Sequence, residues 1–217
     1  MWRCWTPNQL PLLKGNLPKV MFLSAPSTGK TALMEAKAFQ AMQKGLNVLF
    51  LLPYASHHIA KTLLTLKMQQ QWQNLKEKHD WQNELHVCSV KRKSDSIDFE
   101  HMKELIQCEA YRDSAIFADE LSIYDNDDLQ ALTEIATMCE HRTIWLAITF
   151  IRTEKVTKEK VKLDFEMQNF HIPELVNPIR NSKGIIKYAY PSIKGELIQY
   201  YGYWLMSVWM RSFHLNS

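Results

Sequence analysis

The chain has 217 residues, enough for one sizeable domain with its own core. Hydrophobic residues make up 46% of it and charged residues 23%, which excludes an intrinsically disordered chain. The formal net charge of +3 permits an anionic partner, but it is smaller than the excess typical of dedicated nucleic-acid-binding modules.

The first part of the chain alternates between apolar runs and helix-forming stretches. The run at Val20–Ser24 predicts a strand, and the stretch Lys30–Gln43 predicts a helix that Gly45 ends. Asn47–Leu52 predicts a second buried strand, and helical periodicity follows over His57–His79. This order is the beginning of an alternating α/β chain.

The alternation continues over the middle of the chain. In chain order, the expected elements are a strand at Leu85–Val90, a charged loop at Lys91–Asp98, an amphipathic helix at Phe99–Tyr111, a buried strand at Ser114–Ala118, a helix at Asp127–Cys139 behind a polar cap at Asp125–Asn126, and a last clear strand at Thr143–Phe150. Such a pattern predicts an α/β fold with a mostly parallel sheet covered by helices on both faces. The ligand site of such a sheet lies at the carboxyl ends of its strands.

The pattern weakens after Thr153. The charged stretch 155–168 and the prolines that follow, at positions 173, 178 and 191, predict a less regular C-terminal part. We therefore expect one domain over residues 1–190 and a hydrophobic, aromatic extension over residues 191–217.

Cysteine usage and hydropathy favour an intracellular protein of the cytoplasm or nucleus. The four cysteines lie far apart without a CxxC pair, which favours reduced thiols over a disulfide framework or a zinc site. The first residues contain no apolar signal core. No stretch reaches the roughly 18 apolar residues of a membrane helix. The nearest, Leu197–Trp209, is too short and is interrupted by Gln199 and Gly202.

The most specific motif lies between the first predicted strand and the first predicted helix. Its residues, in chain order, are Ser24, Ala25, Pro26, Ser27, Thr28, Gly29, Lys30 and Thr31. A tight loop at this place turns backbone N–H groups toward phosphate oxygens, and the following helix adds its dipole. Gly29 allows close backbone approach, Lys30 reaches the terminal phosphates, and Thr31 offers its hydroxyl to magnesium. The motif predicts a site for a nucleoside triphosphate with Mg²⁺; the alternative is an ordinary strand–turn–helix.

A second candidate feature is the carboxylate pair Asp119–Glu120, placed where the buried strand Ser114–Ala118 is expected to end. Two carboxylates beside a buried strand are costly unless a cation or a reaction needs them. Asp119 is a candidate magnesium ligand beside Thr31, and Glu120 is a candidate general base for the attacking water. The alternative is a solvated turn.

Together these residues resemble the first RecA-like motor domain of superfamily 1 helicases, the group that includes UvrD-like enzymes. Four segments carry the resemblance in the order of the family: Thr6–Gln9 as the glutamine motif, Ser24–Thr31 as Walker A, Phe117–Glu120 as Walker B, and Leu175–Ser182 with Ile185–Ile186 as the arginine segment. The resemblance implies a three-layer RecA-like phosphate-loop NTPase fold that binds ATP and Mg²⁺.

The resemblance also implies roles for residues outside the loop. Gln9 would recognise adenine, and Arg180 would approach the γ-phosphate from the far side, where a guanidinium stabilises developing charge. In related motors the segment after the second strand contacts single-stranded nucleic acid, which makes Ser56–Thr65 a candidate contact for DNA or RNA. A solvated helix face is the alternative for that segment.

Two departures from the family narrow the expected function. The strand Thr143–Phe150 lacks the Gly-Asp-x-x-Gln segment that couples ATP to nucleic acid in the family, and the chain has no room for a second RecA-like domain. A partner protein supplying that domain is one possibility. Nucleotide binding is therefore better supported than hydrolysis, and hydrolysis better than unwinding. The alternatives are a nucleotide-binding switch or a degenerate scaffold without turnover, and, with less support, a small-molecule kinase, because seven scattered arginines form no lid-like cluster.

Overall fold

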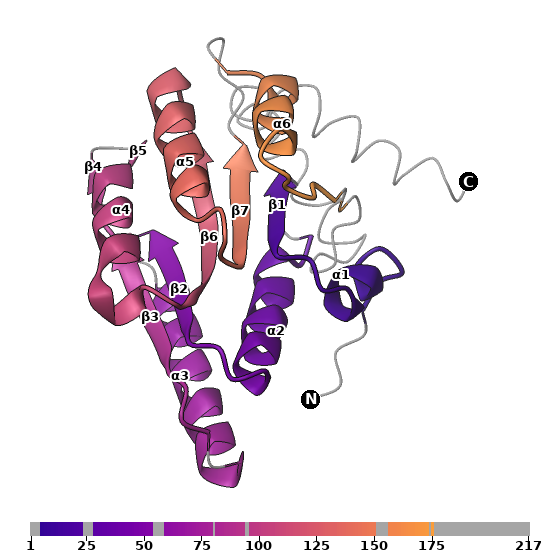
Figure 1. Cartoon of the computed structure of the whole chain (residues 1–217), viewed down its shortest axis with the longest axis vertical. Helices are drawn as coiled ribbons and strands as arrows, with labels where there is room; N and C mark the ends of the chain where they lie inside the picture. The colour runs from indigo at the N-terminus through magenta and orange to yellow at the C-terminus, as the bar shows by residue number, and fades with distance from the viewer. Residues whose placement is uncertain are drawn as a thin grey trace, which may run out of the picture.

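The computed structural model of the chain describes residues 5–23, 28–53, 59–79, 81–93, 96–150, 156–173 and 175. Over these residues it is an α/β fold built on one five-stranded sheet (Figure 1). The strands are β1 (Lys19–Leu23), β2 (Val48–Pro53), β3 (Leu85–Val90), β6 (Ala115–Ile123) and β7 (Ile144–Phe150). Their order in the sheet is β1-β7-β6-β2-β3, and every neighbouring pair is parallel.

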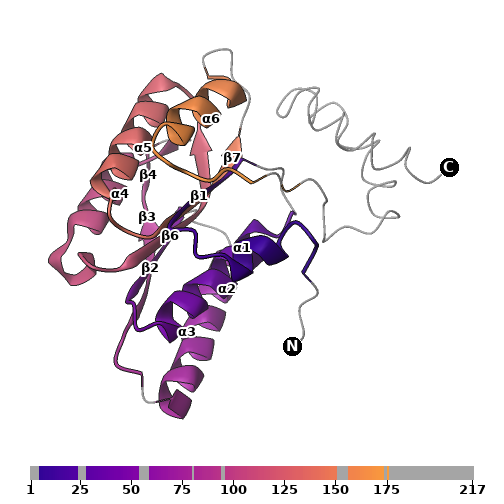
Figure 2. The same cartoon turned by 45° about the vertical axis from the view of Figure 1, so that its right-hand side comes forward.

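Helices cover both faces of the sheet (Figure 2). One face carries α1 (Leu10–Lys14), α2 (Lys30–Gln43) and α3 (Ile59–His79). The other face carries α4 (Phe99–Gln107), α5 (Asn126–Met138) and α6 (Lys158–Glu166). A short 3₁₀ helix, η1 (Glu109–Tyr111), follows α4. The strands β4 (Arg92–Lys93) and β5 (Ser96–Ile97) pair with each other outside the main sheet. The expected parallel sheet flanked by helices is confirmed.

The core is divided by the sheet into two apolar clusters, one on each face. Successive residues of each strand alternate between them: Phe22 and Phe117 face α1–α3, whereas Met21 and Ile116 face α4–α6. All residues of β1 and β2 are buried, because these strands have helices on both sides. This double burial is the physical reason why the strands read as continuous apolar runs.

Three expectations about local structure are wrong. The stretch Lys91–Asp98 contains β4 and β5 besides loop residues. The helix expected over Phe99–Tyr111 ends at Gln107, and the backbone tightens into η1. The charged stretch after Thr153 forms α6, which buries only Val161 and Phe165. Apart from the exposed Leu163, the other residues of α6 are charged, so its buried apolar face is too narrow to dominate the local pattern. The short helix α1 was not expected either.

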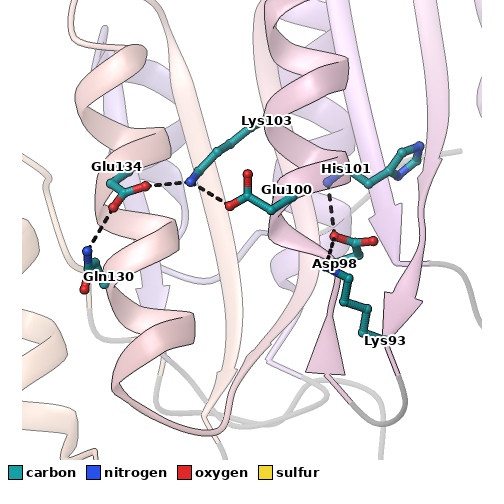
Figure 3. A network of polar contacts seen from close by, with 7 residues as sticks. All are labelled: Lys93, Asp98, Glu100, His101, Lys103, Gln130 and Glu134. Carbon is teal, nitrogen blue, oxygen red and sulfur yellow. Dashed lines mark hydrogen bonds and ion pairs between the residues drawn. The ribbon is translucent and has the colours of Figure 1, made fainter.

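The helices α4 and α5 are joined at their surface by ion pairs (Figure 3). The Lys103 ammonium of α4 lies 2.9 Å from Glu100 Oε1 on the same helix and 2.6 Å from Glu134 Oε2 on α5. These hydrogen bonds, first that from Glu134, raise the pKa of Lys103. At the start of α4, Asp98 Oδ1 accepts the backbone N–H of His101 at 3.2 Å and caps the helix. Such exposed pairs contribute little stability each, about 0–1 kcal/mol.

A single arginine closes the amino-terminal end of the sheet. The guanidinium of Arg142 donates to the carbonyl oxygens of Ile106 at 3.2 Å, Tyr111 at 2.6 Å and Ser114 at 2.9 Å. These carbonyls belong to the end of α4, to η1 and to the residue before β6. Arg142 therefore holds three successive pieces of backbone together from the turn that precedes β7.

We expect Arg142→Ala to lower the free energy of unfolding by about 2–4 kcal/mol, because three carbonyls would lose a charged donor. Urea unfolding followed by circular dichroism measures this change. Arg112→Ala is the matched control, since Arg112 is exposed and makes only a 3.5 Å ion pair with Glu109. Equal midpoints for the two variants would contradict the assigned role of Arg142.

Candidate functional site

The described part of the loop motif lies at the carboxyl end of β1, where α2 begins. Ser24, Ala25, Pro26 and Ser27 lie outside the described residues; Thr28, Gly29, Lys30 and Thr31 lie within them. Gly29 is the N-cap of α2 and has φ +84°, in the left-handed region. Other residues rarely adopt this conformation, so a glycine is needed at this turn. The backbone N–H groups of the first turn of α2 are directed to the same end of the sheet.

The acidic pair lies on β6, two strands away from β1, with β7 between them. The expectation that the strand ends at Asp119 is wrong, since β6 continues to Ile123. Its pairing with β7 shifts register between Ala118 and Leu121, which is a β-bulge. At this bulge Asp119 is 1% exposed, whereas Glu120 is exposed and has φ +55°. The bulge therefore sends adjacent carboxylates into two environments.

The buried Asp119 meets the loop motif. The Thr31 side chain makes a hydrogen bond with the Asp119 carboxylate, and the backbone N–H of Glu120 donates to Asp119 Oδ1 at 2.9 Å. Burial raises the pKa of Asp119, and the hydrogen bond with Thr31 opposes that rise. The pairing of Thr31 with Asp119, expected from the sequence, is present in the fold.

Lys30 lies close enough to Asp119 and Glu120 to interact with both charges. Its side chain is nearly buried, and the residue is only 8% exposed. Burial lowers the pKa of Lys30 to about 8, although the charges of Asp119 and then Glu120 raise it. An ammonium held in this environment is stabilised by an added anion, and the phosphates of a nucleotide would supply one.

The residues present fit a magnesium ion. Mg²⁺ prefers oxygen ligands and is usually held by one or two protein groups together with phosphate oxygens and water. Asp119 and Thr31 offer a carboxylate and a hydroxyl side by side. Across the described part of the chain, no group of three or more His, Cys, Asp or Glu residues could hold a metal ion by itself. A carboxylate and a hydroxyl would leave the other positions of the ion to phosphate oxygens and water.

Gln9 is the third component of the site. It is the N-cap of α1 and is 1% exposed. Its Nε2 donates to the carbonyl oxygen of Thr28 at 3.1 Å, and its Oε1 accepts the backbone N–H of Thr6 at 3.0 Å. Gln9 therefore holds the last loop residue before Gly29. Recognition of adenine by Gln9 stays a prediction.

The remaining candidate residues lie mostly outside the described residues. This applies to Arg180 and, in its segment, to everything except Leu175, which is buried against the α1–α3 face. The first residues of Ser56–Thr65 and the extension 191–217 also lie outside. Cys88, Cys108 and Cys139 are free thiols, and Cys4 is not described.

One residue of functional interest was not expected from the sequence. Lys37 is buried on α2, on the same face as the apolar Leu33, Met34 and Ala41. Its spacing of three or four residues from these neighbours was the available signal. A lysine on the apolar face of a helix predicts that its ammonium has a buried acceptor. The sequence of α2 does not show which acceptor this is, because it lies in another element.

Among the helices that the structure describes, none combines the length and hydropathy needed to cross a membrane. No protein-family model matches the chain, and no curated protein matches it.

Proposed function

We propose that the chain binds ATP together with Mg²⁺ between the carboxyl end of β1 and the bulge in β6. The observation that supports this most directly is the hydrogen bond between Thr31 and the buried Asp119, with the desolvated Lys30 beside them. An ordinary strand–turn–helix has no need of a buried lysine and a buried carboxylate next to each other. The phosphates of a nucleoside triphosphate would complement the charge of Lys30, and its cation would complement the charge of Asp119.

Each residue has a defined task in this proposal. Lys30 binds the terminal phosphates, and the first turn of α2 directs backbone N–H groups toward them. Thr31 and Asp119 would hold Mg²⁺, and the ion would supply positive charge to the phosphate oxygens. Glu120, exposed beside the buried carboxylate, orients and deprotonates the attacking water. The role of Arg180 at the γ-phosphate rests on the family resemblance alone.

We further propose that the domain is one half of a helicase-like motor. The resemblance of four segments supports this, and the observed parallel sheet is compatible with a RecA-like fold. In such a motor, single-stranded DNA or RNA would lie near the carboxyl edge of the sheet. We propose a partner protein as one source of the second motor domain.

A nucleotide-dependent switch without turnover is the second candidate function. Its support is the strand β7, which reads Ile-Trp-Leu-Ala-Ile-Thr-Phe and lacks the Gly-Asp-x-x-Gln segment of the family. A domain that binds ATP but does not couple it to nucleic acid would still need Lys30, Thr31 and Asp119. Turnover is thus the property that separates the two functions.

The test is to measure MgATP binding and steady-state hydrolysis by the full chain, with and without single-stranded DNA or RNA. We expect saturable binding that EDTA abolishes, because Asp119 and Thr31 act on the phosphates through Mg²⁺. Stimulation of hydrolysis by either nucleic acid would select the motor, and binding without turnover would select the switch. No binding of MgATP at millimolar concentration would refute the proposed function.

A further inference from the structure

Lys37 makes an unusual set of contacts on α2. Its ammonium donates to the carbonyl oxygens of Leu12 at 3.3 Å, Leu13 at 3.2 Å and Gly15 at 2.6 Å. These three carbonyls form the C-terminal end of α1 and the residue that follows it. The ammonium also lies 5.4 Å from the ring centroid of Trp145 on β7.

These contacts provide hydrogen-bond donors for the last carbonyl groups of α1, a helix that is too short to be stable alone. The last carbonyls of a helix have no partners within it and carry the negative end of its dipole. An ammonium has three N–H donors, and Lys37 directs them at three carbonyls. Burial, and then the charge of Lys44, lowers the pKa of Lys37, so this charge is kept at a cost. The five residues of α1 are therefore held by α2.

The other end of α1 contacts Thr28, the residue before the N-cap of α2. Gln9, the N-cap of α1, donates to the carbonyl oxygen of Thr28. Thr28 directly precedes Gly29 and Lys30, where α2 begins. Lys37 lies about two helical turns further along α2. The helix α1 is thus fastened at one end to α2 and at the other to the loop that leads into α2.

We infer that Lys37 is a positioning residue for Thr28 and the turn at Gly29, on which it acts through α1 and Gln9 without touching the nucleotide. This inference rests on the proposed function, because it makes α1 a brace for the nucleotide site. Lys37 holds α1 in place, α1 presents Gln9, and Gln9 holds the carbonyl of Thr28. The brace keeps the turn at Gly29 in its binding geometry before a nucleotide arrives.

The first test uses amide hydrogen exchange in the nucleotide-free full chain. In Lys37→Met, the alkyl chain remains and the three donors are lost. We expect amide exchange to be about fivefold faster or more in peptides that cover α1 and in peptides that cover Thr28–Leu33. The reason is the loss of the hydrogen bonds from Lys37 to the C-terminal end of α1. Lys103→Met is the matched control, because it removes a lysine that bonds two residues on the opposite face of the sheet. It should leave both regions unchanged.

The second test is a double-mutant cycle on MgATP affinity, with Lys37→Met and Gln9→Met. Each single variant is expected to weaken binding by about five- to tenfold, the size of one or two lost hydrogen bonds. Because Lys37 is inferred to act on Thr28 through Gln9, the two substitutions should not add. The double variant should bind MgATP with the same affinity as the single variant that binds it less tightly. Lys103→Met should keep wild-type affinity.

The possible outcomes separate this inference from the proposed function. Faster exchange in α1 with an unchanged Thr28–Leu33 region would overturn the inference, since Lys37 would then stabilise α1 only. Additive losses of affinity in the cycle would overturn it as well. If the wild-type chain binds no MgATP while Lys37→Met speeds exchange in both regions, the proposed function is refuted. The structural role of Lys37, which positions Thr28 through α1 and Gln9, is then still supported.

Discussion

Lys30→Ala is expected to weaken MgATP binding by about 10- to 100-fold. The reason is the loss of a charge-assisted contact to phosphate, which contributes about 1.5–3 kcal/mol. Lys30 is only 8% exposed, so its contact with a phosphate would be screened less by water than that of a surface lysine. Titration with a fluorescent ATP analogue in the presence of Mg²⁺ measures the change.

The control for this prediction is Lys44→Ala. Lys44 lies at the end of the same helix, is exposed, and bonds only the side chain of Asn16. Its removal should leave the affinity within twofold of wild type, by the small energies of exposed polar pairs. Equal affinities of Lys30→Ala and wild type would refute the role of Lys30.

The stability of Lys30→Ala shows whether weaker binding comes from the lost ammonium or from unfolding of the variant. Because burial lowers the pKa of Lys30 to about 8, the folded protein holds this ammonium at a cost near neutral pH. Its removal relieves that cost but also takes a positive charge away from Asp119 and Glu120, so the free energy of unfolding of the variant is measured alongside its affinity. A variant that unfolds at the wild-type midpoint and binds poorly has lost a binding group.

Glu120→Gln is expected to lower the turnover of ATP by about 10²- to 10⁴-fold, the range for loss of a general base. Binding of MgATP should remain, because Lys30, Thr31 and Asp119 are unchanged. Steady-state phosphate release, compared with the dissociation constant, checks both parts. Glu140→Gln, an exposed change beyond the end of α5, should keep full turnover.

A second variant at this position tests whether the backbone was shaped for function. Glu120 has φ +55°, a conformation that costs a non-glycine residue about 1 kcal/mol or more. Glu120→Gly should therefore be at least as stable as wild type while it loses turnover. A stability loss in Glu120→Gly, with full turnover in Glu120→Gln, would mean that the bulge serves the fold alone. If wild type shows no turnover, the switch is selected and Glu120 has no catalytic task.

Much of the sheet could be predicted from local sequence. A strand between two layers of helices is apolar at every position, and such a run is visible in the sequence without knowledge of its neighbours, as in β2. The bounds of α2 are the expected Lys30–Gln43, because Gly29 and Gly45, with φ +84° and +83°, mark both ends in the sequence itself. Short or highly charged helices such as α1 and α6 were missed, since tertiary contacts stabilise them.

Part of the candidate site could likewise be predicted from the sequence, and part of it was decided by the tertiary structure. The motif from Thr28 to Thr31 and the pair Asp119–Glu120 are readable as residue types in order, because the chemistry of phosphate and Mg²⁺ demands those types. Only the tertiary structure decided that β7 lies between their strands, that the bulge buries Asp119 against Thr31, and that Glu120 stays exposed. Strand order and register depend on packing between segments far apart in the chain, which local pattern does not contain. The same reason hid the connection from Lys37 through α1 to Gln9, whose donors and acceptors are backbone groups that every residue possesses.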